Sequence, residues 1–472
     1  MFRTLRTHWK KSIFFSCSGG FLTKYLKERW DDRQLMRKFC FEAKKLGDFP
    51  LKRGEQPRKV AVILNPVAKK GKASIQFDKW CAPLLHLAGV EVSIIRTEGE
   101  GQAKEIVENF STAENPVDTL VIAGGDGTVL EAITGLLRRS DALELTRRVA
   151  LGVVPVGASN TVATRLFQGE SGSVRNMLEA TMAVIRAHIR PLDVIKIEAE
   201  DSPKPPVYAA YQIRTGPFQD VEMEIPKYWY YGPAKRFLGY VTAGLKGVQR
   251  SAALDLQLEY TPPCSGCSRC QGFLAEASPK PSAPEASGAS SDSSSSSRPW
   301  WQRWFNFSLS QLFASSRSLN KRGFGTADEE TVDYSKVDNP ECDRWREVFL
   351  FGTTDLLIRA MGDGTLSITA GKNQLPFQEF VSFGRELKRR ILTFDHPLVA
   401  SAFKAQRLRV TPLSTPSGQQ RVVSSTEQQA EEEAVLEEGT GGKHRNVTID
   451  SEQFELRPFT LTLLRDRIRF CY

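Results

Sequence analysis

The sequence predicts an α/β domain with a doubly wound parallel sheet, followed by a domain of mainly antiparallel β structure. Between Lys59 and Asp193, apolar strand patterns alternate with helix patterns, which is typical of a parallel sheet covered by helices on both faces. The most distinctive residues of that region directly follow its strands. After Asp193 the alternation stops, and short alternating runs continue to the end of the sequence, which favours a β-sandwich over a barrel.

The 472 residues leave room for two or three domains, and 40% hydrophobic residues are ordinary for a folded core. The net charge of +9 favours an anionic partner. Because no nucleic-acid-binding module is recognisable, we expect an anionic membrane surface and no nucleic acid. We expect an N-terminal segment and linker (1–58), an α/β domain (59–195) and a β domain (196–472) with low-complexity insertions near 263–340 and 413–445.

The first 27 residues carry six basic residues and no acidic one, together with several large apolar residues. A basic, amphipathic start of this kind resembles mitochondrial targeting. The apolar stretch between Lys11 and Lys24 holds about 12 residues, fewer than the roughly 20 that a membrane-spanning helix needs. We therefore expect the segment to lie on a membrane. A secretory signal is the competing interpretation, but Gly19 and Gly20 interrupt the apolar stretch.

The α/β elements can be assigned in order. KVAVILNP is a buried strand, and a helix pattern follows from Ile75 to Ala88. VEVSIIRTE is the second strand, QAKEIVENF the next helix, and TLVIAGG and LGVVPVG are the third and fourth strands. Ligands of such sheets bind at the carboxyl ends of the strands. The residues at those ends are Asn65, Thr97, Gly124 to Thr128 and Gly157 to Asn160.

Residues 119–135, TLVIAGGDGTVLEAITG, contain the turn that carries the chemistry. Its three glycines permit positive φ and let a bulky anion approach the main chain. The helix that begins near Thr128 adds its N-terminal N–H groups and its dipole, so the turn predicts a phosphate site. Asp126 beside a phosphate indicates either an intervening metal ion or a base for an attacking hydroxyl, and both are phosphoryl-transfer roles. An ordinary glycine-rich turn is the alternative.

The letters GDGT occur a second time, at Gly362 to Thr365. This copy lies between DLLIRAM and LSITA, which are two strand patterns. Asp-Gly between strands is a strong hairpin signal. We therefore predict a hairpin turn there and a phosphate site only at the first copy.

Eight cysteines in a chain of this length do not indicate a disulfide scaffold. Cys264, Cys267 and Cys270 form a CxxCxxC run, but no fourth thiol or histidine is near in sequence. A loop that carries cysteines is therefore favoured over a zinc site.

The motifs taken together resemble a known family. No GxxxxGK[ST] sequence occurs, so the chain is not a P-loop kinase. Asn65-Pro66 with Gly71-Lys72, then GGDGT, then PVGASN resemble in order and spacing the motifs of the diacylglycerol kinase catalytic family, which includes sphingosine kinases and bacterial lipid kinases. LRTHWKK, KGKA, APLLHLAGVEV, EGQAKE and KYWYYGP extend the resemblance to its acylglycerol kinase branch.

The resemblance implies ATP- and Mg²⁺-dependent phosphorylation of monoacylglycerol and diacylglycerol to lysophosphatidic and phosphatidic acid. It further implies a peripheral or shallowly inserted position at the mitochondrial inner membrane, on the intermembrane-space side, and association with subunits of the inner-membrane carrier translocase. Three alternatives stay open: a ceramide or sphingoid-base kinase, an NAD or sugar-phosphate kinase that shares GGDGT, and a mainly structural import subunit with little catalysis.

The same resemblance implies roles for individual residues. Asp126 and Gly125 are the expected catalytic positions, Asp126 and Asp450 the expected metal ligands, and Asp220 and Glu222 the expected lipid head-group positions. DSE at 450–452 resembles the DGE motif of the family, with serine in place of glycine. The expected nucleotide site comprises Asn65, Thr97, Gly124, Gly125, Gly127, Thr128, Glu131, Gly157, Ser159, Asn160, Asp450 and Glu452.

The β domain offers two further hypotheses. An apolar sheet face could hold acyl chains, although core packing explains the same residues equally well. WWQRWFNFSLSQLF at 300–313 is aromatic with basic neighbours, so it could touch a membrane or pack on the β domain.

Overall fold

In the computed structural model, the structure describes residues 9–51, 54, 56–111, 116–167, 173–201, 203–248, 253–264, 266–270, 336–373, 375–386, 396–413 and 445–472, with side chains from residue 18 onward. The aromatic segment 300–313 and most of both predicted insertions lie outside the described residues.

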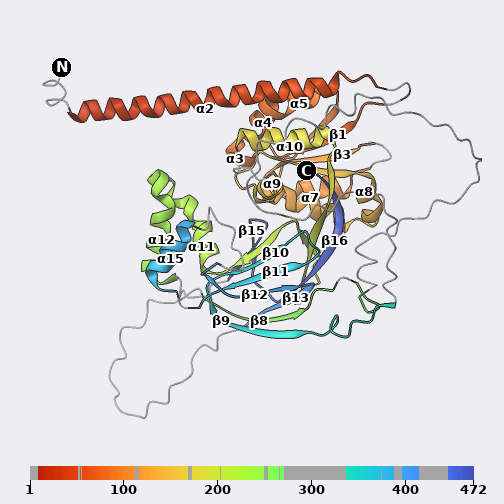
Figure 1. Ribbon diagram of the computed structural model, residues 1–472, viewed down its shortest axis with the longest axis vertical. Helices are drawn as coiled ribbons and strands as arrows, with labels where there is room; N and C mark the ends of the chain where they lie inside the picture. The colour runs from red at the N-terminus through yellow and green to blue at the C-terminus, as the bar shows by residue number, and fades with distance from the viewer. Residues whose placement is uncertain are drawn as a thin grey trace, which may run out of the picture.

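The N-terminal lobe is built on a parallel sheet with strand order β2–β1–β3–β4 (Figure 1). Every residue of the two inner strands β3 and β4 is buried. Strands covered on both faces read as continuous apolar runs, which is why the sequence identified them. The strands are β1 (Lys59–Leu64), β2 (Glu91–Arg96), β3 (Thr119–Gly124) and β4 (Ala150–Pro155).

Helices cover both faces of this sheet, as predicted, and each face has its own apolar core. One face packs against α6 (Gln102–Glu108), α7 (Asp126–Arg138), α8 (Ala142–Arg148) and α9 (Thr161–Phe167). The other packs against α2 (Trp9–Gly47), α4 (Ala73–Gln76), η1 (Phe77–Cys81), α5 (Ala82–Leu87) and α10 (Val174–Arg186). A short turn, α3 (Ala68–Gly71), follows β1.

Helix α2 has two different halves. Its second half belongs to the lobe, since Ala43 is fully buried and Glu42 pairs with Arg186 of α10. Its first half extends past the body of the molecule (Figure 1). Among the described residues, no helix is both long enough and apolar enough to cross a bilayer.

The C-terminal lobe is a sandwich of two sheets, as predicted. One sheet has the order β12–β11–β10–β7–β14–β15, and the other contains β5, β6, β8, β9, β13 and β16. Leucine, isoleucine and valine side chains from both sheets fill the space between them. The strands are β5 (Ile189–Ala199), β6 (Val207–Ala209), β7 (Gln212–Thr215), β8 (Leu254–Thr261), β9 (Arg346–Thr353), β10 (Leu356–Ala360), β11 (Leu366–Gly371), β12 (Val399–Ala405), β13 (Arg407–Pro412), β14 (Asn446–Ile449), β15 (Glu452–Glu455) and β16 (Phe459–Cys471).

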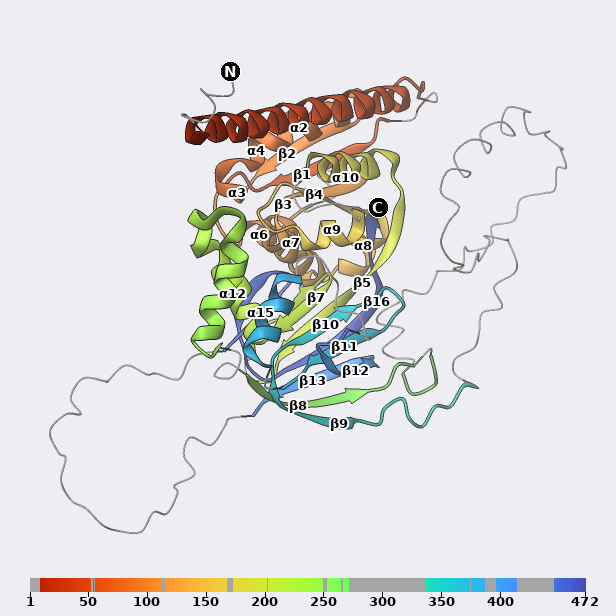
Figure 2. The same cartoon turned by 60° about the vertical axis from the view of Figure 1, so that its left-hand side comes forward.

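Strand β16 joins the two lobes (Figure 2). It pairs with β5 and β13 of the sandwich, and Phe470 near its end pairs in parallel with Leu151 of β4. One continuous ten-stranded sheet results. The last residues therefore return to the α/β lobe, so the predicted boundary near residue 195 does not divide the two lobes at one point along the chain.

The second GDGT copy forms the predicted hairpin turn. Strands β10 and β11 pair antiparallel with Ala360 opposite Leu366, and the turn lies between them. Gly362 and Gly364 both have positive φ, at 74° and 73°. This hairpin confirms that the two copies differ in structure.

A small helical layer, which the sequence analysis did not predict, packs on the sandwich. It contains α11 (Pro217–Glu224), η2 (Ile225–Ala234), α12 (Lys235–Leu245) and α15 (Phe377–Glu386). Phe218, Tyr240 and Phe380 form its aromatic centre. Glu222, an expected lipid head-group position, lies on α11 of this layer.

Candidate active site

The GGDGT turn and the loop 157–160 pack main chain against main chain. The N–H of Gly157 donates to the carbonyl of Gly124 at 3.1 Å, and the N–H of Asp126 donates to the carbonyl of Ser159 at 3.1 Å. A Cβ on Gly157 would lie 2.2 Å from Gly125 Cα. Glycine is required here because the two loops touch.

The expectation that these glycines take positive φ is wrong. Gly124, Gly125, Gly127 and Gly157 all lie outside that region, and Gly125 is extended, with φ −97° and ψ −174°. Steric contact with neighbouring atoms, and not the backbone conformation, requires glycine at these positions. A Cβ on Gly124 would lie 2.6 Å from Thr128 Oγ1, and one on Gly127 would lie 2.3 Å from Glu452 Oε1.

Asp126 begins α7 and is 1% exposed. Its Oδ2 accepts the N–H of Thr161 at 2.9 Å, and its Oδ1 accepts the N–H of Val162 at 3.1 Å. Those donors are the first N–H groups of α9, which otherwise have no intrahelical acceptor. Asp126 thus starts one helix and caps another, and each of its oxygens retains a second acceptor direction.

Asn65 and Thr128 meet at the end of β1. Asn65 Nδ2 donates to Thr128 Oγ1 at 3.1 Å, while Asn65 Oδ1 accepts the N–H groups of Val67 and Ala68. Asn160 is turned inward, since its amide bonds both the N–H and the carbonyl of Gly157 and so closes the 157–160 loop. Asn160 therefore shapes the loop through its own side chain.

Thr97 and Glu131 lie at the edge of the same site. The N–H of Thr97 donates to the carbonyl of Leu64, which places the end of β2 beside Asn65. Glu131 on α7 accepts the N–H of Gly101 at 3.1 Å and so fixes the loop after β2. Desolvation raises the pKa of Glu131, although this hydrogen bond acts in the opposite direction.

The β14–β15 hairpin brings the DSE residues to this point from the other lobe. Ile449 pairs with Glu452, so Asp450 and Ser451 form a two-residue turn, and both have positive φ, at 44° and 77°. Such turns require positive φ at both central positions. Ser451 Oγ lies 3.0 Å from Thr161 Oγ1, so the turn contacts the start of α9.

Asp450 is buried, and its carboxylate holds the backbone between β6 and β7. Oδ1 accepts the N–H groups of Tyr211 and Gln212 at 3.0 and 2.8 Å, and Oδ2 accepts that of Ala210 at 2.5 Å. Burial raises its pKa to about 7 against these hydrogen bonds, and nearby Asp126 adds to the rise. Three of about four acceptor directions are taken, so one is left for a metal ion.

Glu452 of the C-terminal lobe packs against Gly127 of the N-terminal lobe. Partial desolvation raises its pKa, and the neighbouring charges of Asp126, Glu131 and Glu100 raise it further. Neighbouring carboxylates repel one another when they are ionised, and a cation bound between them would stabilise their charged forms.

The comparisons with known proteins agree with this geometry. Residues 59–197 match the family model of the diacylglycerol kinase catalytic domain. This segment is similar to diacylglycerol kinase catalytic domains. It contains β1 to β4, both glycine loops and Asp126, whereas the DSE turn lies beyond it.

The chain is also similar in sequence to curated proteins that are named as lipid kinases. The chain is 38% identical to "Acylglycerol kinase, mitochondrial" of Xenopus laevis over 246 residues, 52% of this chain and 56% of the relative. It is also 38% identical to the Homo sapiens protein of that name over 234 residues, 50% of this chain and 54% of the relative. Sphingosine kinase 1 of Arabidopsis thaliana is 29% identical over 180 residues, 38% of this chain and 36% of the relative. The match thus spans about half the length of the acylglycerol kinases.

Among solved structures, a diacylglycerol kinase from Bacillus anthracis str. Sterne aligns with a TM-score of 0.45 and 15% identity, covering 89% of this chain and 98% of that one.

Glu222 lies away from the kinase domain's glycine loops, in a polar cluster on the helical layer. It pairs with Arg236 and accepts the hydroxyl of Tyr240. Burial and the carboxylate of Glu222 raise the pKa of Tyr240, so its hydroxyl stays protonated. Nearby, Arg214 of β7 forms a bidentate pair with Asp355 at 2.7 and 2.9 Å. Asp220 lies two residues before Glu222, in the first turn of α11.

The sequence analysis missed Arg236 and Tyr240. A cavity of about 1010 Å³ lies beside this cluster, between η2, α12 and α15. Arg236, Lys235 and Arg385 give its wall a basic character.

Proposed function

We propose that the protein is a lipid kinase that transfers the γ-phosphoryl group of ATP to a free hydroxyl of monoacylglycerol or diacylglycerol. One observation carries the proposal. Two glycine loops at helix N-termini pack around buried Asp126, and the acidic DSE turn of the other lobe faces them. The relatives named acylglycerol kinase support the substrate class.

The nucleotide is assigned to the carboxyl ends of β1, β3 and β4. Phosphate is expected to approach the GGDGT main chain, where the start of α7 supplies N–H groups and a favourable dipole. Asn65, Thr97 and Glu131 define the wall beside β1 and β2. Positioning dominates the rate of such reactions, because the transfer needs little covalent chemistry from the protein.

The acidic residues fit Mg²⁺, which prefers oxygen ligands. Asp126 and Glu452 lie close enough for their charges to interact, and together with phosphate oxygens they would hold the ion. Asp450 would supply a further ligand through its remaining acceptor direction. When bound, Mg²⁺ would neutralise charge on the phosphates. Asp126 is therefore proposed for either of two roles, a ligand of the metal ion or the base that accepts the proton of the lipid hydroxyl.

The direct test offers purified full-length protein radiolabelled ATP with monoacylglycerol, diacylglycerol, ceramide or NAD in mixed micelles. Labelled lysophosphatidic and phosphatidic acids are expected. Label in ceramide phosphate would move the substrate class to sphingolipids, and label in NADP alone would refute a lipid kinase.

The Glu222 cluster is proposed as the head-group site. Strand β7 begins at Gln212, which contacts Asp450, and ends just before α11, which carries Glu222. A strand roughly 13 Å long therefore leads from the DSE turn to the start of that helix. The inter-sheet space is filled by side chains, which favours core packing there over acyl-chain binding. The cavity beside Arg236 is the better position for the lipid.

Glu222→Gln is expected to raise the KM for acylglycerol about 10-fold, the loss of one charge-assisted hydrogen bond, with the KM for ATP unchanged. Glutamine can still accept a hydrogen bond from Arg236, so the fold should persist. Glu224→Gln is the matched control, because Glu224 pairs with Lys227 on the exposed face. Equal KM values for the Glu222→Gln variant and the wild-type enzyme would remove Glu222 from the head-group site.

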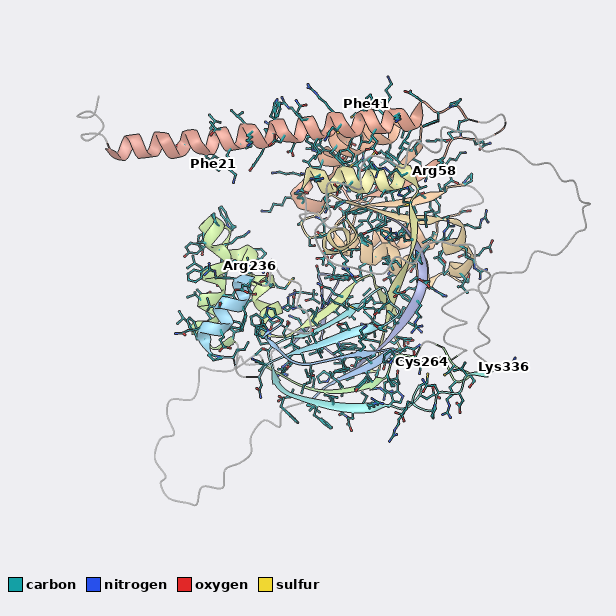
Figure 3. The ribbon with its side chains drawn as sticks, in the orientation of Figure 1. Phe21, Phe41, Arg58, Arg236, Cys264 and Lys336 are labelled. Carbon is teal, nitrogen blue, oxygen red and sulfur yellow. The ribbon has the colours of Figure 1, made fainter. Side chains whose placement is uncertain are left out.

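An anionic membrane is proposed to bind the side of the molecule where α2 extends. Phe21, Leu22, Tyr25 and Leu26 form one exposed apolar stripe on α2, and Lys24 and Lys27 lie beside it on the same part of the helix. Trp229, Tyr230 and Tyr231 of η2 are exposed too, Trp229 to 75%. Both elements lie on the same side in Figures 1 and 2, and Figure 3 places Phe21 and Arg236 there. Aromatic and basic residues together favour the membrane interface.

Trp229→Ser with Tyr230→Ser is expected to weaken sedimentation with vesicles that contain anionic phospholipid by about 10-fold or more, since each aromatic loses roughly 1.5–3 kcal/mol of apolar burial. The control replaces Phe349 and Phe351 by serine. These side chains are also exposed, but they stack on each other on β9. If both double variants lose vesicle binding equally, η2 is not the docking surface.

The mitochondrial location, the intermembrane-space side and the association with the carrier translocase are proposed from the family resemblance and from the word mitochondrial in the names of relatives. Tagged protein isolated from mitochondria should co-purify with translocase subunits. The same result with the inactive Asp126→Asn variant would separate an import role from catalysis.

A further inference from the structure

Four cysteines come together at one edge of the sandwich. Figure 3 labels one of them, Cys264. Cys264, Cys267 and Cys270 follow β8, and Cys342 precedes β9. All four are buried and none forms a disulfide. The fourth thiol, which the CxxCxxC run lacks in sequence, is therefore supplied by the fold.

The sulfur positions match a single tetrahedral ion. All four sulfur atoms lie within 4.8 Å of one another, and Cys270 Sγ is 3.6 Å from Cys267 Sγ and 3.8 Å from Cys264 Sγ. A tetrahedron with zinc–sulfur bonds of about 2.3 Å has sulfur atoms about 3.8 Å apart. A cluster of several iron atoms needs a wider cage of thiolates, so one ion fits this space better.

We propose that Cys264, Cys267, Cys270 and Cys342 bind one structural zinc ion as four thiolates. Four sulfur ligands are typical of closed structural zinc sites, and they leave no open position for catalysis. The kinase site lies elsewhere, at the junction of the lobes. The zinc site is therefore independent of the proposed kinase activity.

The surroundings of this four-cysteine cluster suit a charged tetrathiolate centre. Asn339 Nδ2 donates to Cys264 Sγ at 3.4 Å, and the N–H of Cys267 points to Cys270 Sγ at 3.3 Å. Such donors orient metal-bound thiolates. Arg465 holds the loop through the carbonyl of Cys264 at 2.8 Å, and Arg407 lies close enough for Cys342 and Cys270 to influence it electrostatically. These cations would offset the two net negative charges of a zinc tetrathiolate.

The ion would join the chain on either side of residues 271–335. Other contacts already bring these ends together, since Ser268 N–H donates to the carbonyl of Val337 and Arg269 pairs with Asp338. Zinc would thus fasten the neighbouring strands β8 and β9 at the edge of the sheet. A metal that binds only the folded state adds its binding free energy to stability.

The test measures metal in full-length protein purified without chelator. Plasma mass spectrometry is expected to find about one zinc ion per chain. Cys342→Ser should lose it, and Cys342→His should retain it because imidazole is also a zinc ligand. Cys40→Ser, a partly exposed cysteine outside the cluster, should leave the zinc content unchanged. Replacement by Co²⁺ should give the visible absorption bands of a tetrahedral tetrathiolate.

A strong chelator should lower the melting temperature of the wild type and of Cys40→Ser but not that of Cys342→Ser. If Cys342→Ser does not fold, the zinc content and cobalt spectrum of the wild type decide. Three results for the wild-type protein would each overturn the proposal. The protein could lack zinc and have four free, titratable thiols in the cluster, its intact mass could reveal disulfides, or it could contain iron in place of zinc.

Discussion

Asp126→Asn is expected to fold and to bind ATP but to lose at least about 100-fold in turnover, the usual contribution of a positioned acid–base group. In the wild type, the N–H groups of Thr161 and Val162 both donate to Asp126. Asparagine has the same shape, but its NH₂ group would face one of these two donors and leave it without an acceptor. The variant should therefore also lose about 1–2 kcal/mol of stability through the cap of α9. Turnover, ATP affinity and urea unfolding measured on one preparation separate these effects.

The sequence provides a matched control in its second GDGT copy. Asp363 lies in the β10–β11 hairpin turn, where it pairs with Lys404. Asp363→Asn changes the same atoms within the same four letters and should leave turnover intact. Comparable loss in both variants, or near-wild-type turnover in Asp126→Asn, would remove Asp126 from the mechanism.

Gly157→Ala is expected to abolish activity and to lower the melting temperature clearly. The new Cβ would lie 2.2 Å from Gly125 Cα and 2.6 Å from Gly125 N, so two stretches of main chain would have to separate. Crowding in packed sites costs typically about 1–3 kcal/mol, and backbone cannot rotate away as a side chain can. Separated loops would also break the hydrogen bond from Gly157 N–H to Gly124.

Gly127→Ala tests whether a steric clash destabilises the fold less when the new Cβ meets a flexible side chain instead of the main chain. Its Cβ would also come too close to a neighbour, but that neighbour is the end of the flexible Glu452 side chain. We expect nearly normal stability with reduced activity, because Glu452 is displaced. If thermal melting shows Gly157→Ala to be as stable as Gly127→Ala, the two glycine loops do not need their close contact.

The kinase motifs could be predicted from the sequence because they are local. The glycines, Asp126 and the following helix lie within residues 119–135, and the context of strands on both sides separated the two GDGT copies. Asp450 and Glu452 were found only through a motif resemblance. Nothing in their spacing showed that Asp450 would bind the backbone of Ala210, Tyr211 and Gln212.

Contacts between distant segments could not be predicted from local patterns. Cys342 joins three cysteines from which a long insertion separates it, so the sequence pattern alone favoured a loop. The helical layer was not predicted because the apolar residues of α11 and α12 pack on a sheet, where burial overrides local preference. The positive φ expected at GGDGT was wrong because steric contact with a second loop, invisible in that stretch, selects glycine there.

The pairing of β16 with β4 bears on how the chain is made. Leu151 and Phe470 are partners, so a ribosome must synthesise all the intervening residues before β4 acquires this neighbour. Until then, the N-terminal lobe exposes the unpaired backbone of a fully apolar strand, which is a site for aggregation. Contacts this far apart in sequence also form slowly. We therefore expect nascent chains to depend on chaperones until translation is nearly complete.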